Sequence, residues 1–250
     1  MAKMLNKNVV LITSAVYTNY GIYDANQRIQ QTTDTVISAR KYIPNATIIL
    51  IDNSKVEVQQ DESNEFNALI DLVDYYVDNS DDKDIQHFHN NVQNYDIGKN
   101  AMEVIGMIKA LLYITTDPAI MSIITSATRI FKLSGRYQVT DKFDITQFDN
   151  ANTIGKYVFK TAQPAWISAE ETGGTTLLQT RLWSFTPDLL IDTIQLFNNI
   201  ITNMIATFNA GRYIDVEHSM VKYLPKDKLV EVTSVGLQGN IAPNGMMIID

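Results

Sequence analysis

The sequence contains no cysteine among its 250 residues, and this absence removes several kinds of chemistry. A chain without thiols forms no disulfide, gives no thiolate to a metal and has no cysteine nucleophile, and it is compatible with a reducing compartment. A long apolar segment is also missing, because the run Val9 to Ile12 after the polar segment Met1 to Lys7 is too short for a signal or a membrane span. We therefore expect a cytoplasmic protein without a membrane span.

An excess of positive charge is likewise missing. The chain has 20 Lys and Arg against 28 Asp and Glu, for a formal net charge of -8. Affinity for nucleic acid comes largely from clustered Lys and Arg, so we expect no nucleic-acid partner, although a local basic pocket stays open. Hydrophobic residues make up 45% of the chain, as in ordinary folded proteins, and no break in composition divides it. We expect a single domain over residues 1–250.

Common catalytic signatures are absent too. No Gly-rich dinucleotide fingerprint follows the first predicted strand, and no Gly-Lys-Ser/Thr phosphate loop occurs. No Gly-x-Ser-x-Gly elbow presents a hydrolase serine. These absences disfavour dehydrogenases, P-loop enzymes and serine hydrolases.

What the sequence does contain is an alternation of buried strands and amphipathic helices. Asn8 to Ser14 and Thr47 to Ile51 are β-branched runs typical of buried strands, and the helical pattern from Asn26 to Tyr42 lies between them. This order predicts a right-handed crossover in a parallel sheet, whose ligands bind beyond the carboxyl ends of the strands. The polar residues at those ends are Thr13, Ser14, Asp52 and Asn53.

The remaining pattern predicts a Rossmann-like, mostly parallel α/β sheet flanked by helices, with a mixed C-terminal half. We interpret residues 1–140 as a nucleotide-binding half and residues 141–250 as an acceptor-binding half. Asp78 to Gln93 has no periodicity and predicts an exposed loop. The further helices are expected at Glu65–Leu72, Gly98–Thr115, Pro187–Phe208 and Glu217–Tyr223, and the further strands at Tyr75–Val77, Arg129–Leu133, Lys156–Thr161 and Gln179–Phe185.

Several segments resemble a group of bacterial and viral glycosyltransferases with the GT-A fold. The most specific is the Lys-x-Ser-Gly-Arg-Tyr sequence at Lys132 to Tyr137. The others are Arg28–Thr32, Ser38–Lys41, Ile43–Ala46, Ile48–Ser54 and Gly239–Gly245. Together with the first strand they extend over nearly the whole chain. The resemblance implies transfer of a sugar from a nucleoside-diphosphate sugar to a hydroxyl acceptor such as a growing glycan, in the host cytoplasm if the chain is viral.

The resemblance also implies a donor site. In the GT-A fold, the first strand and the turn after the second hold the nucleoside, which assigns donor binding to Thr13, Ser14 and Asp52. The alternative for Asp52 is a turn cap. Most GT-A proteins carry an Asp-x-Asp pair that holds Mn²⁺ or Mg²⁺ after a later strand, but this chain has Ser134-Gly135-Arg136 there. This difference puts the metal dependence in doubt.

Cationic side chains offer a physical substitute for the metal. A departing diphosphate needs positive charge, and a guanidinium can donate paired hydrogen bonds to phosphate oxygens. Arg136 is the candidate, with Lys132 as its helper and Gly135 allowing the backbone to approach the phosphates. The alternative is a salt bridge from Arg136 to Asp141 or Asp144. Arg28 and Lys99, at the starts of predicted helices, are further candidates for phosphate binding or are solvated.

A transferase of the inverting type needs a carboxylate that takes the proton of the acceptor hydroxyl. Glu217 is the candidate base, and His218 could orient Glu217 or contact phosphates; the alternative is that Asp215 to Glu217 cap a helix. Three aromatic residues could stack on a sugar or a base or lie in the core: Tyr137, Trp166 and Trp183.

Two polar segments have less specific interpretations. One is an acidic segment with two histidines, Asp81 to Asp84 with His87 and His89. Carboxylates and imidazoles are metal ligands, but the segment is equally compatible with a solvated loop or with a lid over the site. Glu170 to Thr176 suits a flexible loop over an acceptor or a plain turn. Two rival functions stay open: a nucleotidyltransferase, which normally needs carboxylates around Mg²⁺, and a non-catalytic module that binds a nucleotide or a glycan.

Overall fold

A seven-stranded sheet forms the centre of the protein. The computed structural model describes residues 7–55, 64–241 and 244–250, so most of the polar N-terminal segment and residues 242–243 of the Gly239–Gly245 motif lie outside the described part. The strand order is β10-β6-β9-β4-β1-β2-β3. The strands are β1 (Asn8–Ser14), β2 (Ala46–Asp52), β3 (Tyr75–Asp78), β4 (Arg129–Ser134), β6 (Tyr157–Lys160), β9 (Leu182–Phe185) and β10 (Leu229–Val232).

Strands β1 to β4 are parallel, whereas β9 runs antiparallel to both β4 and β6. The parallel strands are buried on both faces, which explains their continuous β-branched sequences. The predicted mostly parallel α/β sheet is therefore confirmed, and the antiparallel pairing lies in the C-terminal half. Ser14 pairs with Asp52 and Thr13 with Ser134, so the polar ends of β2 and β4 flank the end of β1.

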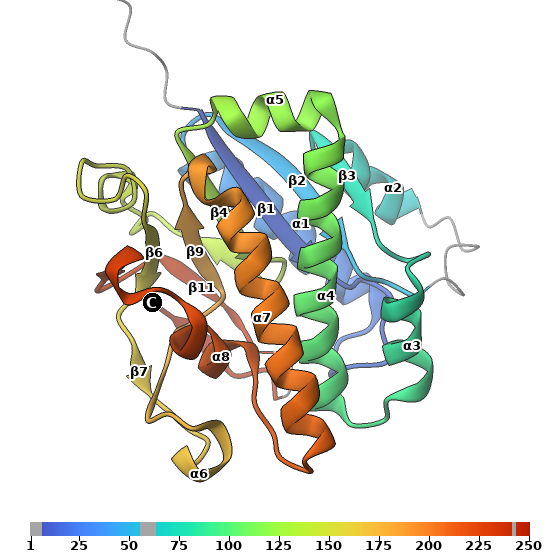
Figure 1. Ribbon diagram of the computed structural model, residues 1–250. Helices are drawn as coiled ribbons and strands as arrows, with labels where there is room; N and C mark the ends of the chain where they lie inside the picture. The colour runs from blue at the N-terminus through green and yellow to red at the C-terminus, as the bar shows by residue number, and fades with distance from the viewer. Residues whose placement is uncertain (1–6, 56–63, 242–243) are drawn as a thin grey trace, which may run out of the picture.

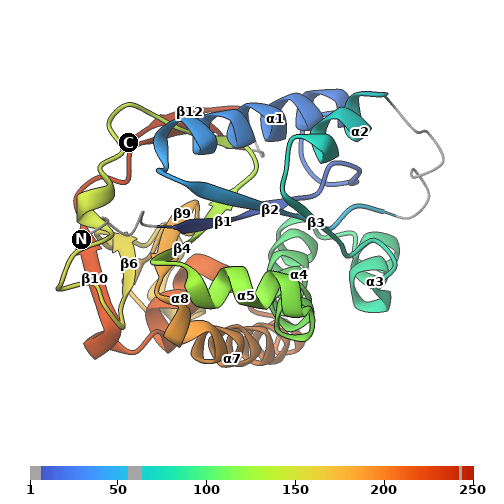
Figure 2. The same cartoon turned by 90° about the horizontal axis from the view of Figure 1, so that it is seen from above.

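Helices cover both faces of the sheet (Figure 2). On one face lie α1 (Ala25–Tyr42) and α2 (Asn64–Asp71). The other face carries α4 and α7 side by side (Figure 1), with the shorter helices around them. The helices on this second side are α3 (Lys83–Asn91), α4 (Tyr95–Thr116), α5 (Pro118–Ser126), α7 (Leu190–Asn209) and α8 (Val216–Tyr223). Two apolar clusters pack against the sheet, one on each face.

Helix α1 begins and ends at residues that the sequence marks. Asp24 accepts a hydrogen bond from the backbone of Gln27, and the Gln27 side chain accepts one from the Asp24 backbone, which is a reciprocal N-terminal cap. At the other end, Pro44 follows the last turn, where it cannot continue the helix. The helix thereby starts near the carboxyl end of β1 and brings its first turns to the same edge of the sheet.

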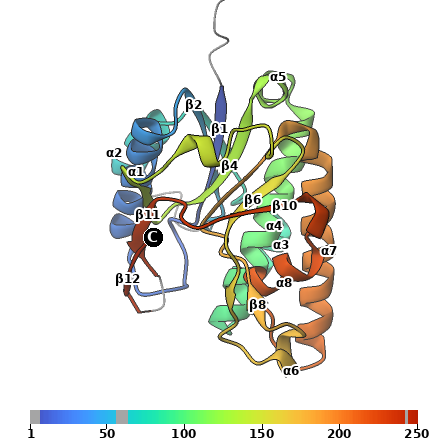
Figure 3. The same ribbon diagram turned by 90° about the vertical axis from the view of Figure 1, so that its left-hand side faces the viewer.

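The C-terminal part of the chain returns to this edge. A second sheet pairs β5 (Tyr137–Val139) with β11 (Leu237–Asn240) and β11 with β12 (Met247–Ile249), beside the α1 face (Figure 3). A side chain at Gly239 would place its Cβ 2.5 Å from the backbone oxygen of Arg136. This close approach, which only glycine permits without a shift, holds β11 against the residues that follow β4.

The prediction of an exposed loop from Asp78 to Gln93 is wrong. Lys83 to Asn91 form helix α3, whose N-cap Asp82 accepts hydrogen bonds from the backbones of Asp84 and Ile85. Ile85 and His89, one helical turn apart, are buried, and the Nε2 atom of His89 lies 2.8 Å from the Asn53 carbonyl oxygen. Ile85 and Phe88 are the only apolar residues of this short helix, and the buried His89 beside them is polar, so the sequence gives little sign of a helical period.

The other short elements complete the chain and add two features that the sequence analysis did not anticipate. Helix α5 follows α4 directly, with Asp117 as its N-cap and Pro118 in its first turn. Gly173, with φ of 77°, ends the short helix α6 (Ala169–Thr172) within the segment that was expected to be a loop. The remaining elements are β7 (Gln163–Pro164), β8 (Thr176–Leu177) and the 3-10 helices Ile145–Gln147, Pro187–Leu189 and Lys226–Lys228.

Among the described residues, no single helix has the length and apolar character required to cross a membrane. Helices α4 and α5 meet those requirements only as a joined pair that bends by 98°.

Candidate active site

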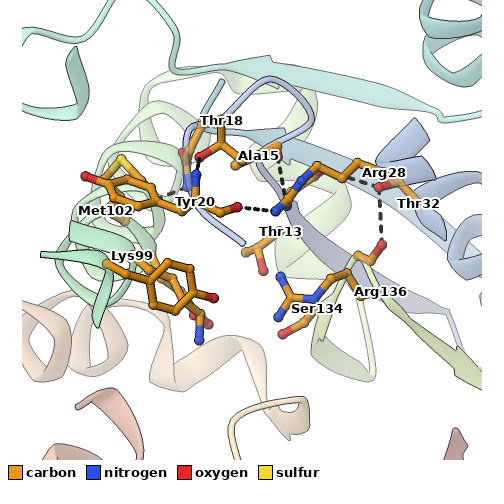
Figure 4. A pocket seen from close by; sticks show the side chains of 15 residues that line it. Thr13, Ala15, Thr18, Tyr20, Arg28, Thr32, Lys99, Met102, Ser134 and Arg136 are labelled. Atoms are coloured by element: carbon orange, nitrogen blue, oxygen red, sulfur yellow. Dashed lines mark hydrogen bonds between the residues drawn. The ribbon is translucent and has the colours of Figure 1, made fainter. Parts of the chain in front are cut away.

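A pocket lined by several polar and charged side chains opens beyond the carboxyl ends of β1 and β4. Helices α1 and α4 and the segment after β1 complete its walls (Figure 4). The sequence-predicted residues Thr13, Ser14, Arg28, Lys99, Gly135 and Arg136 all line it. The pocket also contains side chains that the sequence analysis did not assign, among them Tyr20, Thr32, Tyr95, Met102, Glu103 and Ser134.

Gly135 brings the turn after β4 against the end of β1. Its N–H donates to the Thr13 carbonyl over 2.8 Å, and its own carbonyl accepts a hydrogen bond from the Thr32 hydroxyl over 3.2 Å. A Cβ atom at this position would stand 3.0 Å from the Thr13 carbonyl oxygen. The small residue therefore serves the packing of two backbone segments, and this packing places the next residue, Arg136, at the pocket.

Arg28 holds the segment that follows β1 in place by hydrogen bonds to its backbone. It is 6% exposed, and its guanidinium donates to the carbonyls of Ala15 and Tyr20 (Figure 4) and to that of Tyr23. A guanidinium has five N–H donors, so two remain for another acceptor. Burial, followed by the nearby charge of Arg136, lowers the pKa of Arg28 to about 10. Two cations thus lie close together, an arrangement that an anion would stabilise.

Arg136 has no ionic partner within the described part of the chain. The proposed alternative, a salt bridge to Asp141 or Asp144, does not occur among the ion pairs there. Asp144 instead caps the turn at Ile145. The Nε atom of Arg136 is buried without a hydrogen-bond partner, and its guanidinium carbon lies 6.0 Å from the centre of the Tyr137 ring. This guanidinium is therefore available to a ligand in the pocket.

A second pocket, of about 350 Å³, adjoins the first. Both are lined by Lys99, Glu103, Ser134 and Arg136, so a ligand in one pocket would meet a ligand in the other at these side chains. The further lining comes mostly from late segments of the chain and includes Tyr137, Trp166, Thr180, Arg181, Asp215 and Glu217. Trp166 is 58% exposed and gives the second pocket an open aromatic surface.

Glu217 lies in the first turn of α8 and is half-buried at the second pocket. Its Oε1 atom accepts a hydrogen bond from the Thr180 hydroxyl over 3.0 Å. Burial is the main cause that raises the pKa of Glu217 above the usual range of a glutamate, and the charges of Asp215 and Glu103 act in the same direction, against Lys99. A carboxylate of raised pKa is suited to take up a proton.

The surroundings of Glu103 lower its pKa, whereas those of Glu217 raise the pKa of Glu217. Burial alone would raise its pKa, but Lys132, Lys99 and Arg136 together lower it. Lys99 and Glu103 are four residues apart on α4, and this spacing is the one sequence signal that could have indicated Glu103. Glu103 and Glu217, two of the carboxylates that line the joined pockets, therefore differ in the protonation state that their surroundings favour.

Lys132 lines neither pocket, contrary to its expected role as a phosphate contact. Its side chain is 2% exposed, and its ammonium lies 2.6 Å from Glu103 Oε1, 2.8 Å from the Ser134 hydroxyl and 3.0 Å from the Thr180 carbonyl. These three acceptors satisfy all of its N–H donors. Lys132 therefore acts indirectly, through its contacts with Glu103 and Ser134, which line both pockets.

Asp52 also lies outside both pockets. It is 1% exposed, and its Oδ1 atom accepts a hydrogen bond from the backbone of Val16 over 3.1 Å. Burial raises the pKa of this carboxyl group. The turn-cap alternative describes this contact, and the neighbouring Asn53 lines the first pocket instead.

His218 does not orient Glu217. Its Nδ1 atom and its backbone N–H both lie at Oδ1 of Asp215, at 2.5 and 2.9 Å, and Asp215 is the N-cap of α8. The imidazole and the Trp166 ring are perpendicular in an edge-to-face contact, with ring centres 5.7 Å apart. The capping role that was considered for this cluster is thus filled by Asp215 and leaves Glu217 in the pocket wall.

The aromatic and the metal-binding candidates from the sequence occupy different kinds of position in the structure. Trp183 is buried and stacks on Phe159, so it belongs to the core, whereas Tyr137 is buried but borders the second pocket. In the acidic segment before α3, Asp82 caps the helix and pairs with Lys109. Throughout residues 7–55, 64–241 and 244–250, no three His, Asp or Glu side chains are grouped so as to hold a metal ion.

Comparison with protein families and with curated proteins finds no match to this sequence. Among solved structures, the chain is similar to the galactosyltransferase LgtC in complex with donor and acceptor sugar analogues. The TM-score is 0.50 and the identity 10%, over 90% of this chain and 73% of LgtC. The chain has the GT-A fold.

Two other solved structures are more distant. Mouse xyloside xylosyltransferase 1 gives a TM-score of 0.43 at 8% identity, over 91% of this chain and 85% of that protein. The 4-diphosphocytidyl-2C-methyl-D-erythritol synthase of Anaerococcus prevotii gives 0.41 at 13% identity, over 92% and 93%. These lower scores add nothing to the fold assignment, which rests on LgtC and on the sheet topology.

Within this GT-A fold, the end of β4 does not suit a divalent cation. The side chains there are Ser134 and Arg136, and a guanidinium repels a metal ion. Glu103, the carboxylate common to both pockets, is already bound to Lys132. Because these donors do not fit Mn²⁺ or Mg²⁺, no step of the proposed chemistry passes through a metal.

Proposed function

We propose that this protein is a glycosyltransferase that moves a sugar from a nucleoside-diphosphate sugar to a hydroxyl group of an acceptor, such as a glycan. The GT-A fold is compatible with this activity. The main support is the pair of joined pockets, because a transferase must hold two substrates with their reacting atoms adjacent.

The first pocket is the proposed donor site. Arg136, the two unused N–H groups of Arg28, and Lys99 offer positive charge to the diphosphate. Negative charge grows on the leaving oxygen as its bond to the sugar breaks, and fixed cations stabilise that charge without reorganising. Thr13 and Ser14 line the same pocket at the end of β1, where they offer hydroxyl groups to the donor.

The second pocket is the proposed acceptor site. Glu217 takes the proton of the acceptor hydroxyl while the oxygen attacks the anomeric carbon, and the bond from that carbon to the diphosphate breaks. The electron pair leaves with the nucleoside diphosphate, next to Arg136. Thr180 holds the Glu217 carboxylate, and its own carbonyl is held by Lys132.

The observation that carries the proposal is the position of Arg136. It stands where the pockets join and has no ionic partner in the described part of the chain. A guanidinium that only stabilised the fold would be expected to have a fixed acceptor. Its free donors and the second cation beside it indicate an anionic ligand.

The test is release of nucleoside diphosphate from a panel of UDP-, GDP- and dTDP-sugars, with mixed saccharides as acceptors, in EDTA and in Mn²⁺. The wild-type protein should release the diphosphate from one donor class, and Glu217→Gln should not. Glu65→Gln on exposed α2 is the matched control and should behave as wild type. Binding without release would identify a non-catalytic module, and pyrophosphate release from a nucleoside triphosphate would identify a nucleotidyltransferase.

A further inference from the structure

A fourth cation stands at the joined pockets, away from the proposed diphosphate site. Arg181 lines the second pocket but not the first. Its Nε atom donates to the Tyr137 hydroxyl over 3.1 Å, and its guanidinium carbon lies 5.4 Å from the centre of the Tyr137 ring. The guanidinium is thus fixed in place by an aromatic residue that is itself buried.

This arrangement leaves most of the Arg181 guanidinium unused. One of its five N–H donors is engaged, and the two terminal nitrogens have no hydrogen-bond partner within the described residues. No described carboxylate forms an ion pair with it. An oriented guanidinium without a carboxylate partner can donate paired hydrogen bonds to two oxygens of a carboxylate or a phosphate.

Three of the four carboxylates that line the second pocket have their own partners. Asp215 accepts from the backbone and the ring of His218, Glu103 from Lys132, and Glu217 from Thr180. The fourth, Asp96, forms no ion pair with Arg181, so none of them neutralises the Arg181 charge directly. The exposed face of Trp166 in the same pocket suits a sugar ring.

We propose that the acceptor is an acidic saccharide whose carboxylate or phosphate group binds Arg181 while its ring lies against Trp166. This inference rests on the proposed glycosyltransferase function, in which the acceptor is the second substrate, and it adds the chemical class of that acceptor. Arg181 follows Thr180, the residue that holds Glu217, and its carbonyl accepts a hydrogen bond from the Ser134 backbone. An acid group anchored there keeps a neighbouring hydroxyl of the same sugar near Glu217.

The experiment measures binding of three simple saccharides by calorimetry, with and without a nucleoside diphosphate. Methyl glucuronide carries a carboxylate, methyl glucoside 6-phosphate a phosphate, and methyl glucoside no charge. We expect at least one acidic probe to bind about tenfold or more tightly than the neutral one, as charge-assisted hydrogen bonds are stronger than neutral ones. The two acidic probes distinguish the carboxylate from the phosphate.

Arg181→Gln should abolish the preference for the acidic probe, and Arg181→Lys should retain part of it, because lysine keeps the charge but not the paired donors. Arg212→Gln, at an exposed position outside both pockets, is the matched control. Equal binding of neutral and acidic probes, or a preference that survives in Arg181→Gln, would overturn the proposal. Nucleotide binding that stays intact in Arg181→Gln would separate that failure from a failure of the proposed function.

Discussion

The buried ammonium of Lys132 and the half-buried carboxylate of Glu103 form an ion pair, 2.6 Å apart, and Glu103 lines both pockets. The pair joins β4 to α4, and the same ammonium binds the carbonyl of Thr180, whose hydroxyl holds Glu217. One cation therefore positions side chains in the walls of both pockets without contacting either ligand.

Replacing Lys132 by Met should destabilise the fold strongly. The half-buried carboxylate of Glu103 would lose its ion-pair partner. Breaking a fully buried pair typically costs about 3–5 kcal/mol, so the loss here should lie toward the lower end of that range. Urea unfolding at pH 7 measures the loss. The double variant Lys132→Met/Glu103→Gln should regain part of it, because it removes the orphaned charge. A double variant less stable than Lys132→Met alone would contradict the argument.

Replacing Gly239 by Ala should weaken both the fold and nucleotide binding. The added Cβ would meet the Arg136 carbonyl oxygen at 2.5 Å, so the backbone that carries Arg136 must shift. Overpacking of this kind typically costs about 1–3 kcal/mol. Gly174→Ala is the matched control, because its Cβ meets nothing nearer than 3.9 Å. Thermal unfolding and calorimetry should separate the two variants, and equal behaviour would refute the packing explanation.

The pH dependence of the rate should reflect Glu217. A base acts when ionised, and the pKa of Glu217 is raised, so kcat/KM should increase with pH in a range above the usual pKa of a glutamate. Glu217→Gln should reduce the rate by about 10²- to 10⁴-fold and lose this ascending limb. A variant that keeps the wild-type pH profile would exclude Glu217 as the base.

Stability should respond to pH through the same residue. Between the unfolded and the higher native pKa of Glu217, the native state binds more protons than the unfolded state, so this contribution to stability falls as pH rises. Relative to wild type, Glu217→Gln should therefore gain in melting temperature from pH 4 to pH 8. Melting curves recorded at intervals of one pH unit measure this. A difference in melting temperature that stays constant across the range would contradict the raised pKa.

The sequence predicted the sheet well because buried parallel strands leave continuous β-branched runs. Strand β1 was expected from Asn8 to Ser14 and is found there, and α1 differs from its predicted range by one residue. Helix α3 was missed because it is short and has only Ile85 and Phe88 as apolar residues, and because its buried face also contains the polar His89. The small sheet around β11 depends on pairing between residues about a hundred positions apart, which no local pattern indicates.

The residues at strand ends were predicted to lie near the site, and several of them do line the first pocket. The order of the strands alone brings Thr13, Ser14 and Gly135 to the same edge of the central sheet. Side-chain direction could not be predicted in the same way. Lys132 and Asp52 are turned into the protein by ion pairing and by hydrogen bonding to the backbone, and only the folded structure reveals those partners.

The central claim is that Arg136 binds the diphosphate of a sugar donor, and calorimetric titration with UDP, GDP and dTDP in EDTA tests it most directly. The wild-type protein and Arg212→Gln should bind one of the three nucleotides equally well, and Arg136→Gln should lose about tenfold or more in affinity, because charge-assisted hydrogen bonds to phosphate are removed. Absence of binding by the wild-type protein in EDTA and in Mn²⁺, or unchanged affinity in Arg136→Gln, would contradict the account.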